Sequence, residues 1–259
     1  YSSAASDVYK RQGKSEKFNQ YASMTSEFEN RDNRMKNSLL ANGTKYWANK
    51  DAECRIDWKG MEGEDATHAM TCDVRTGSGY QNQKWCAERK VKDEQEGYDY
   101  PIIRYAEVLL NYAEAIFESG ASDAEVDKAL NISLNLVRQR VNPDMPKLST
   151  DFVNRHGLDM QEEIRRERTV ELYNEGFRID DLKRWNEALV EMPKDILGIQ
   201  WKDTEFETTW NNASSMARNE DGCLIMESGR SWSSKNDLYP LPADQIQLNP
   251  NLGQNPGWQ

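Results

Sequence analysis

Three glutamates in one short stretch are the first residues whose spacing could do chemistry. Glu167, Glu171 and Glu175 lie within EEIRRERTVELYNEGFRIDDLKRW, residues 162–185. A spacing of four places them on one face of a helix, where like charges repel, so they require cations or protons. Carboxylates gathered in this way serve as metal ligands, as the acid and base of a glycosidase, or as one side of an ion-pair network.

The residues around these glutamates favour the ion-pair network. A carboxylate-bridged di-iron bundle requires Glu-x-x-His pairs, and neither His68 nor His156 follows a glutamate at that spacing. A glycosidase requires two carboxylates that flank a cleft, and sequence alone leaves this alternative open. The cations available to neutralise the glutamates are Arg104, Arg138, Arg140, Arg168, Arg178 and Arg184. We therefore predict that the glutamates lock helices together, and we assign no catalytic residue.

The four cysteines do not form a metal-binding pattern. Cys54, Cys72, Cys86 and Cys223 include no C-x-x-C pair, and the chain has only 2 histidines, which disfavours structural zinc. A disulfide among the first three cysteines and free buried thiols both remain open. We expect no metal and no other cofactor.

Charge and composition exclude several classes of function. The 33 basic and 44 acidic residues leave a net charge of −11, which repels nucleic acid. The 8 Trp, 11 Tyr and 6 Phe are too many aromatic residues for a disordered chain. No apolar run is long enough to span a bilayer. Residues 1–12, YSSAASDVYKRQ, carry no core pattern, and we set them aside as a non-native leader.

A helical hairpin is the strongest structural signal. Pro101 and Gly120 bound a predicted helix over residues 102–119, and a second helix runs from residue 122 or 123 to about residue 141. In the first helix the residues expected to face inward are Ile102, Tyr105, Ala106, Leu109, Tyr112, Ala113, Ile116 and Phe117; in the second they are Val126, Ala129, Leu130, Leu134 and Val137. The hairpin has the length of a tetratricopeptide repeat, without a second in-phase copy.

The remaining segments are expected to be less regular. A helix is predicted over residues 159–174, with a break at Gly176 and a continuation over residues 179–190. Residues 41–100 are expected to be loop-rich with short strands, such as one over residues 80–87, and residues 191–237 to form an irregular insertion. The tail, residues 238–259, is expected to be extended or turning. The predicted fold is mainly α, with helical hairpins over residues 101–190 and loop-rich portions around them.

Six sequence blocks in order then resemble the C-terminal signature of the SusD/RagB family of outer-membrane nutrient-binding lipoproteins. They are ENRDNRM, GYQNQKW, PIIRYAEVLLNYAEAIFESG, LVRQR, the glutamate-rich stretch and YPLPADQIQLNPNLGQNPGW. Each block is moderately specific, but their order is highly specific. The resemblance implies that residues 13–259 are the C-terminal part of a single SusD-like domain whose N-terminal half lies upstream.

The resemblance also implies a function and a location. A member of this family binds oligosaccharide or polysaccharide at the cell surface without catalysis and delivers it to a SusC-like TonB-dependent transporter. It faces outward from the outer membrane on an N-terminal lipid anchor, which is absent from this chain. The alternatives are a peptide- or protein-binding member of the same family and a glycoside hydrolase.

Aromatic residues in the loop-rich portion are the expected glycan contacts. Aromatic rings stack on the apolar faces of sugars, while polar side chains pair with the hydroxyls. The predicted ligand-binding residues are Tyr46, Trp47 and Trp58 for stacking, and Asn49, Arg55 and Asp57 for the hydroxyls. Packing within the fold is the alternative for each ring, and it is the expected role of Trp85 and Trp185. Trp201, Trp210 and Trp232 could serve the ligand or the transporter.

Overall fold

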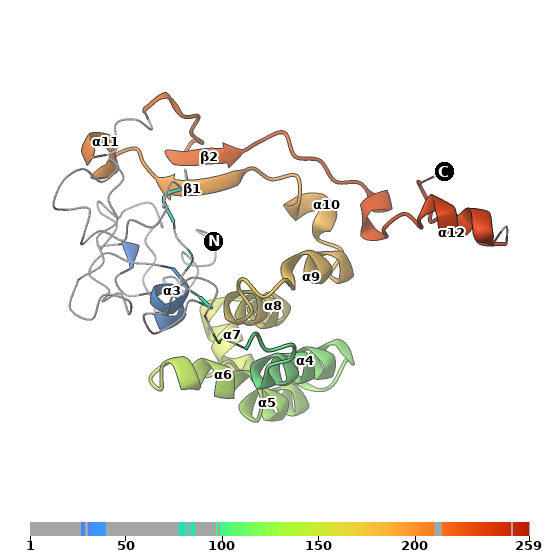
Figure 1. Ribbon diagram of the computed structural model, residues 1–259. Coiled ribbons are helices and arrows are strands. Elements are labelled where there is room, and N and C mark those ends of the chain that lie inside the picture. The colour runs from blue at the N-terminus through green and yellow to red at the C-terminus, as the bar shows by residue number, and fades with distance from the viewer. Residues whose placement is uncertain are drawn as a thin grey trace.

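A computed structural model describes residues 27–28, 31–39, 78–80, 82, 84–85, 97, 99–209, 214–249 and 251–258. Figure 1 shows a layer of helices, α4 to α8, at one end of the molecule and a two-stranded sheet, β1–β2, at the other. An arm that carries α12 extends sideways to the C-terminus. The predicted mainly α fold is confirmed. Among the described residues, no helix has both the length and the apolar composition that a bilayer span requires.

The helical layer is built on one continuous apolar core. Its elements are α4 (Tyr105–Glu118), α5 (Asp123–Asn131), α6 (Leu134–Val141), α7 (Thr150–His156) and α8 (Met160–Glu171). Helix α4 packs against α5, α6 and α8. Leu110, Leu130, Leu134 and Ile164 are at most 1% exposed within this core. Removing such side chains from water is the main stabilising contribution to the layer.

Helix α4 differs from its prediction in its start and in its buried face. Residues 101–104 precede the helix, and Arg104 is its N-cap. The predicted inward residues Ile102, Tyr105 and Tyr112 are 90%, 72% and 44% exposed. The buried face is instead centred on Ala106, Leu110, Ala113 and Glu114. Arg184 and Trp185 donate hydrogen bonds to the Glu114 carboxylate, so this charged residue is buried. The buried face of α4 is therefore rotated about the helix axis relative to the predicted apolar face.

The predicted second helix is interrupted. It breaks into α5 and α6 at Ile132 and Ser133, because Ser133 has non-helical backbone angles and its hydroxyl donates to the Ala129 carbonyl at 2.6 Å. Such local side-chain bonds compete with the helical ladder. The five residues predicted to face inward on α5 and α6 are all buried, as expected.

The stretch after α8 contains two short helices rather than one long one. These are α9 (Arg178–Arg184) and α10 (Ala188–Glu191), whereas a single helix over residues 179–190 was predicted. Asn186 has a φ of +59°, a left-handed conformation that ends the first helix. Helix α7, with Ser149 as its N-cap, was not predicted at all.

The region predicted as an irregular insertion contains the sheet. Strands β1 (Ile196–Gln200) and β2 (Cys223–Glu227) pair antiparallel, with Gln200 opposite Cys223 and irregular register between. Together with α3 (Asn33–Ser38) and α11 (Phe206–Thr209), they enclose a second core of Phe28, Leu39, Ile199, Trp201, Phe206 and Leu224. Of residues 80–87, the described ones contribute only an isolated bridge between Asn82 and Leu39 rather than a strand.

The C-terminal arm is also more ordered than predicted. It begins with a 3-10 turn, η4 (Ser234–Asp237), just before the predicted tail. Within residues 238–259 it contains α12 (Ala243–Leu248), which corrects the prediction of a purely extended or turning tail. The Trp258 indole donates to the Lys235 and Leu238 carbonyls at 2.8 and 2.9 Å. The arm is therefore closed on itself by its last residues.

Candidate functional site

The predicted glycan contacts lie outside the residues that the structure describes. These are Tyr46, Trp47, Asn49, Arg55, Asp57 and Trp58, and the same holds for Cys54, Cys72, Cys86 and Trp210. Their roles remain predictions. The described residues do show the glutamate cluster and a cavity beside it.

The glutamate cluster is an ion-pair network, as predicted. Glu167, 2% exposed, accepts from Arg34 at 2.7 Å and from Arg138 at 3.0 Å. Glu171 lies 3.2 Å from Arg34 and accepts from Arg104 and Arg140 at 3.0 and 2.9 Å. The network joins α3, the start of α4 and α6 to α8.

The third glutamate, Glu175, lies four residues beyond the end of α8 and completes the network. Glu175 accepts from Lys84 at 2.5 Å and from Arg104 at 2.7 Å. Lys84 and Arg34, both missed by the sequence analysis, come from the two blocks shared with the family, GYQNQKW and ENRDNRM. The basic residues within these two blocks could therefore have been predicted as partners of the glutamates.

Not every arginine named from sequence belongs to this network. Arg168 and Arg184 bind Asp181 at 2.8 Å instead, and Arg184 also donates to Glu114 at 2.8 Å. The Trp185 indole, 7% exposed, donates to Glu114 at 2.6 Å. Trp185 is therefore part of the scaffold, as predicted. Trp201, which was expected to contact the ligand or the transporter, is instead 7% exposed in the second core.

Arginine partners lower the pKa values of three carboxylates, those of Glu171, Asp32 and Glu114. Burial alone would raise the pKa of Glu171, but the hydrogen bond and charge of Arg140, with Arg34 and Arg104, lower it below its ordinary value. The same balance holds for two other carboxylates. Burial alone would raise the pKa values of Asp32 and Glu114, but Arg34 lowers that of Asp32 and Arg184 lowers that of Glu114. A carboxylate stabilised in its charged form is a poor proton donor at neutral pH.

These lowered pKa values predict loss of stability in acid. A carboxylate whose pKa is lower in the folded chain stabilises the fold fully above its unfolded pKa, and that contribution is lost as pH falls through the folded pKa. We expect the free energy of unfolding to be flat near neutrality and to fall as pH drops from about 5 to about 3. Urea denaturation at each pH measures this.

Glu125 provides the control for this experiment. Its pKa is also lowered, by the Ser122 hydroxyl and amide, but it is exposed to solvent, so Glu125→Gln should leave the slope against pH nearly unchanged. A stability that stays constant down to about pH 3 would contradict the network as a source of folding free energy.

The single described cysteine is not a reactive site. Cys223 is buried in β2 as a free thiol, and burial, with the charges of Asp221 and Glu27, raises its pKa to about 11. A thiol that stays protonated is a weak nucleophile and a weak metal ligand. Among the described residues, no group of three or more His, Cys, Asp or Glu side chains is placed to hold a metal ion.

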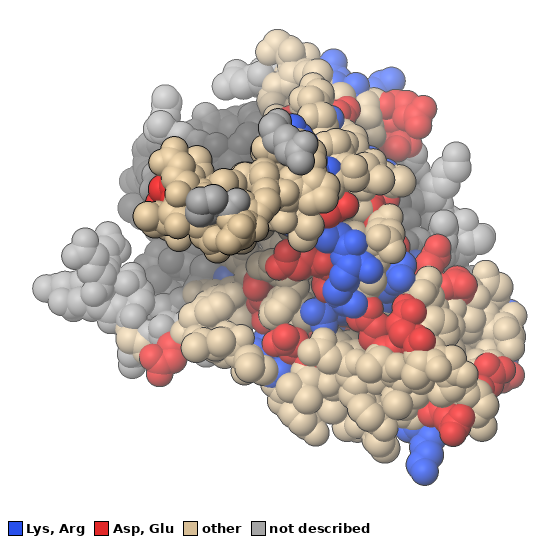
Figure 2. All heavy atoms as spheres, turned by 90° about the vertical axis from the view of Figure 1, so that its right-hand side faces the viewer, with Lys and Arg blue, Asp and Glu red and all other residues tan. Residues whose placement is uncertain are grey.

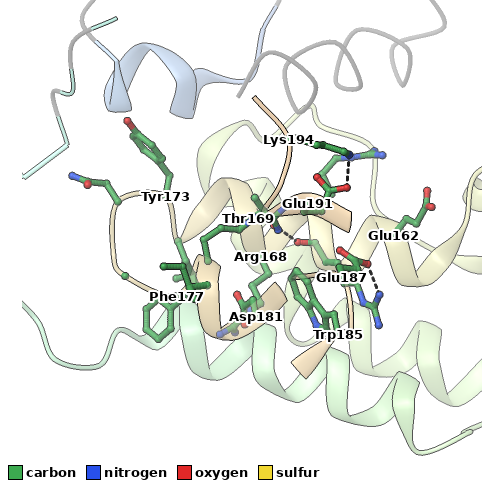
Figure 3. A pocket seen from close by; sticks show the side chains of 17 residues that line it. Glu162, Arg168, Thr169, Tyr173, Phe177, Asp181, Trp185, Glu187, Glu191 and Lys194 are labelled. Carbon is green, nitrogen blue, oxygen red and sulfur yellow. Dashed lines mark hydrogen bonds and ion pairs between the residues drawn. The ribbon is translucent and has the colours of Figure 1, made fainter. Parts of the chain in front are cut away.

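A cavity of about 640 Å³ lies between α8, α9 and α10. Figure 3 shows the aromatic rings of Tyr173 and Phe177 at one end of it and Glu162 at the other. The basic side chains that line it are Arg165, Arg166, Arg168, Arg178 and Lys194, and the acidic ones are Glu162, Asp181, Glu187 and Glu191. Viewed from the side toward which the arm extends, basic and acidic side chains cluster in the middle of the molecular face (Figure 2). Sequence periodicity did not reveal the cavity, because it forms where the chain leaves α8 and turns back.

The family model described as the SusD family matches residues 2–258. The chain belongs to the SusD family. The mainly α architecture and the arginine-neutralised glutamates therefore belong to a SusD-family scaffold. Among curated proteins, none matches this chain.

Solved structures share the fold of this SusD-family chain. A SusD-like carbohydrate-binding protein from Bacteroides fragilis has a TM-score of 0.67 at 22% identity, with 96% of this chain and 48% of that chain covered. A second SusD-like protein from Bacteroides fragilis has a TM-score of 0.59 at 24% identity, with 90% and 40% covered. This chain thus spans about half or less of the length of these relatives.

Proposed function

We propose that this SusD-family chain belongs to a non-catalytic protein that binds oligosaccharide or polysaccharide at the cell surface and delivers it to a SusC-like TonB-dependent transporter. The observation that carries the proposal is the family match over residues 2–258. A carbohydrate-binding protein of the same fold, with a TM-score of 0.67, supports a sugar ligand.

The glutamate network supports binding over catalysis. A glycosidase requires one carboxylic acid with a raised pKa beside a second carboxylate. Burial alone would raise the pKa values of Glu171 and Glu114, but their arginine partners outweigh it and lower both, and Glu167 is enclosed by two guanidinium groups. These carboxylates act as structural anions, which favours the binding function over the hydrolase alternative.

The glycan contacts are proposed to lie in the segment before residue 99, which the sequence predicts to be loop-rich. Trp185 and Trp201 are both buried, so their ring faces are occupied by protein. Tyr46, Trp47 and Trp58 carry the proposed stacking contacts, with Asn49, Arg55 and Asp57 as the hydroxyl partners. Loops on a rigid scaffold are the usual location for such contacts.

Binding to a glycan array tests the sugar ligand and these residues together. We expect Trp47→Ala and Trp58→Ala each to weaken binding by about tenfold, because a stacking aromatic side chain is a typical energetic centre of an interface. Tyr239→Ala is the matched control, since this ring is 74% exposed on the C-terminal arm, and it should bind like the unchanged protein.

Three results would count against the proposal. Undiminished binding by both tryptophan variants would reject the proposed contacts. Release of reducing ends from a polysaccharide by the purified protein would support the glycoside hydrolase instead. Binding of peptides with no binding of any sugar would support the peptide-binding alternative.

The membrane location and the transporter partner have their own test. The proposed protein carries a lipid anchor upstream of this sequence and faces outward from the outer membrane. Affinity purification of the full-length protein from its own cells should recover a TonB-dependent transporter. Labelling of intact cells should reach the protein. Recovery without a transporter partner would contradict the delivery step.

A further inference from the structure

Arg178 differs from the other arginines of the helical region. Residues 99–209 contain nine arginines, and eight of them form an ion pair with a carboxylate. Arg178 is exposed, and among the residues that the structure describes it has no carboxylate partner. Its guanidinium donates to the Thr169 hydroxyl at 3.1 Å and lies 5.9 Å from the centre of the Trp185 ring.

The two contacts that Arg178 makes with the fold are weak ones, an exposed hydrogen bond of 3.1 Å to Thr169 and a distance of 5.9 Å to the Trp185 ring. Arg178 is the first residue of α9, where the positive end of the helix dipole disfavours a cation. Lys183 and Arg184 of the same helix occupy its last turn, where the negative end of the dipole favours a cation. An exposed, unpaired guanidinium at the start of a helix contributes little to stability.

The acidic residues of the cavity do not neutralise Arg178. Arg168 and Arg184 bind Asp181, Arg165 binds Glu187 at 2.7 Å, and Lys194 binds Glu191. Glu162 lies at the opposite end of the cavity from Tyr173 and Phe177 (Figure 3). Among the described residues that line the cavity, Arg178 is therefore the basic side chain without an ion pair, and Glu162, at the far end, is the acidic one without an ion pair.

The cavity has the other features of a small-ligand site. Its volume of about 640 Å³ is within the usual range for such sites. The rings of Tyr173 and Phe177 line one end of it. A planar guanidinium matches a carboxylate through two parallel hydrogen bonds. The Thr169 hydroxyl donates to the Arg165 carbonyl at 2.8 Å and accepts from Arg178, so it orients the guanidinium.

We propose that this cavity binds the carboxylate of an acidic sugar, with the Arg178 guanidinium as its ligand. The inference rests on the proposed glycan-binding function and names one class of sugar, the uronates, at a second position on the protein. The net charge of −11 opposes anions at long range. We therefore expect weak binding, and expect it to weaken further at high salt because screening reduces the attraction of Arg178.

The test measures which sugars reach the cavity and whether Arg178 holds them. The ¹⁵N-labelled 259-residue chain is titrated with methyl glucuronide, with the neutral methyl glucoside, and with sodium acetate. We expect the glucuronide to bind most tightly and to shift the indole NH signal of Trp185. Arg178→Gln should weaken glucuronide binding about tenfold, since hydrogen bonds to charged groups are strong.

Two further variants separate binding from folding. Arg178→Lys keeps the charge but loses the planar fork, so it should bind the glucuronide more weakly than the unchanged protein. Arg155→Gln is the matched control, because Arg155 is 65% exposed on α7 and does not line the cavity. It should bind like the unchanged protein, and the three variants should unfold at similar temperatures.

The outcomes separate this inference from the proposed function. Equal binding of glucuronide and glucoside, acetate binding as tight as glucuronide, or unchanged binding by both Arg178 variants would overturn the acidic-sugar site. Neutral glycans captured on the array would then leave the proposed function intact. No sugar binding of any kind, on the array or in the titration, would overturn both.

Discussion

Replacing Arg138 with methionine should lower the free energy of unfolding by about 3–5 kcal/mol, because it removes one partner of a buried ion pair. Arg138 is 2% exposed and donates to Glu167 at 3.0 Å and to the Pro146 carbonyl through Nε and Nη2 at 3.2 and 3.1 Å. Methionine fills similar volume, so lost packing contributes little. The dominant cost is a buried Glu167 with one cation fewer. Urea denaturation followed by circular dichroism measures the change.

A second substitution shows whether the effect comes from the charge. In a Glu167→Gln background, Arg138→Met should cost at least about 1 kcal/mol less, since the uncompensated charge is already gone. The control is Arg155→Ala, whose pair with Asp151 has side chains 65% and 77% exposed, and it should change stability by at most about 0.5 kcal/mol. Equal costs for Arg138→Met in both backgrounds would show that Arg138 acts through packing and its hydrogen bonds to Pro146 rather than through Glu167.

Replacing Trp185 with alanine should cost about 3–5 kcal/mol, as expected for a large buried aromatic side chain. The ring is 7% exposed, its indole donates to Glu114 at 2.6 Å, and the guanidinium groups of Arg184 and Arg165 lie 4.8 and 5.1 Å from its centre. Alanine would both leave a void and remove a donor from a buried carboxylate. The midpoint of urea unfolding should fall with little change in its slope.

Two matched variants identify what Trp185 contributes. Trp185→Phe keeps most of the apolar surface and loses the indole donor, so it should cost about 1–3 kcal/mol. Trp232 is partly exposed and binds Asp237 at 3.1 Å, so Trp232→Ala should cost at most about 1 kcal/mol. Similar costs for Trp185→Ala and Trp232→Ala would contradict a scaffold role for Trp185.

The sequence was informative where periodicity and charge acted together. Glutamates spaced by four residues predicted an ion-pair network, and Arg104, Arg138 and Arg140 do bind them. The buried faces of α5 and α6 follow the apolar spacing. These features can be predicted from sequence because residues three or four apart lie on the same face of a helix.

Features set by contacts distant in sequence were missed. The outward turn of Tyr105 and Tyr112 depends on Glu114, which is buried by partners about 70 residues away. Strands β1 and β2 are separated by a long connection, and a short apolar run cannot be assigned to strand or helix by period alone. The cavity beside Arg178 could not be predicted, because the sequence does not show which carboxylates pair with the neighbouring basic residues.

The position of Arg34 in the glutamate network has a consequence for the order of folding. Its guanidinium reaches Glu167 and Glu171 across 133 and 137 residues of sequence. Closing so long a loop is slow compared with forming the α4–α8 layer from nearby contacts. We therefore expect the segment that carries Arg34 to dock late, after Arg138 and Arg140 have paired with Glu167 and Glu171 within the layer.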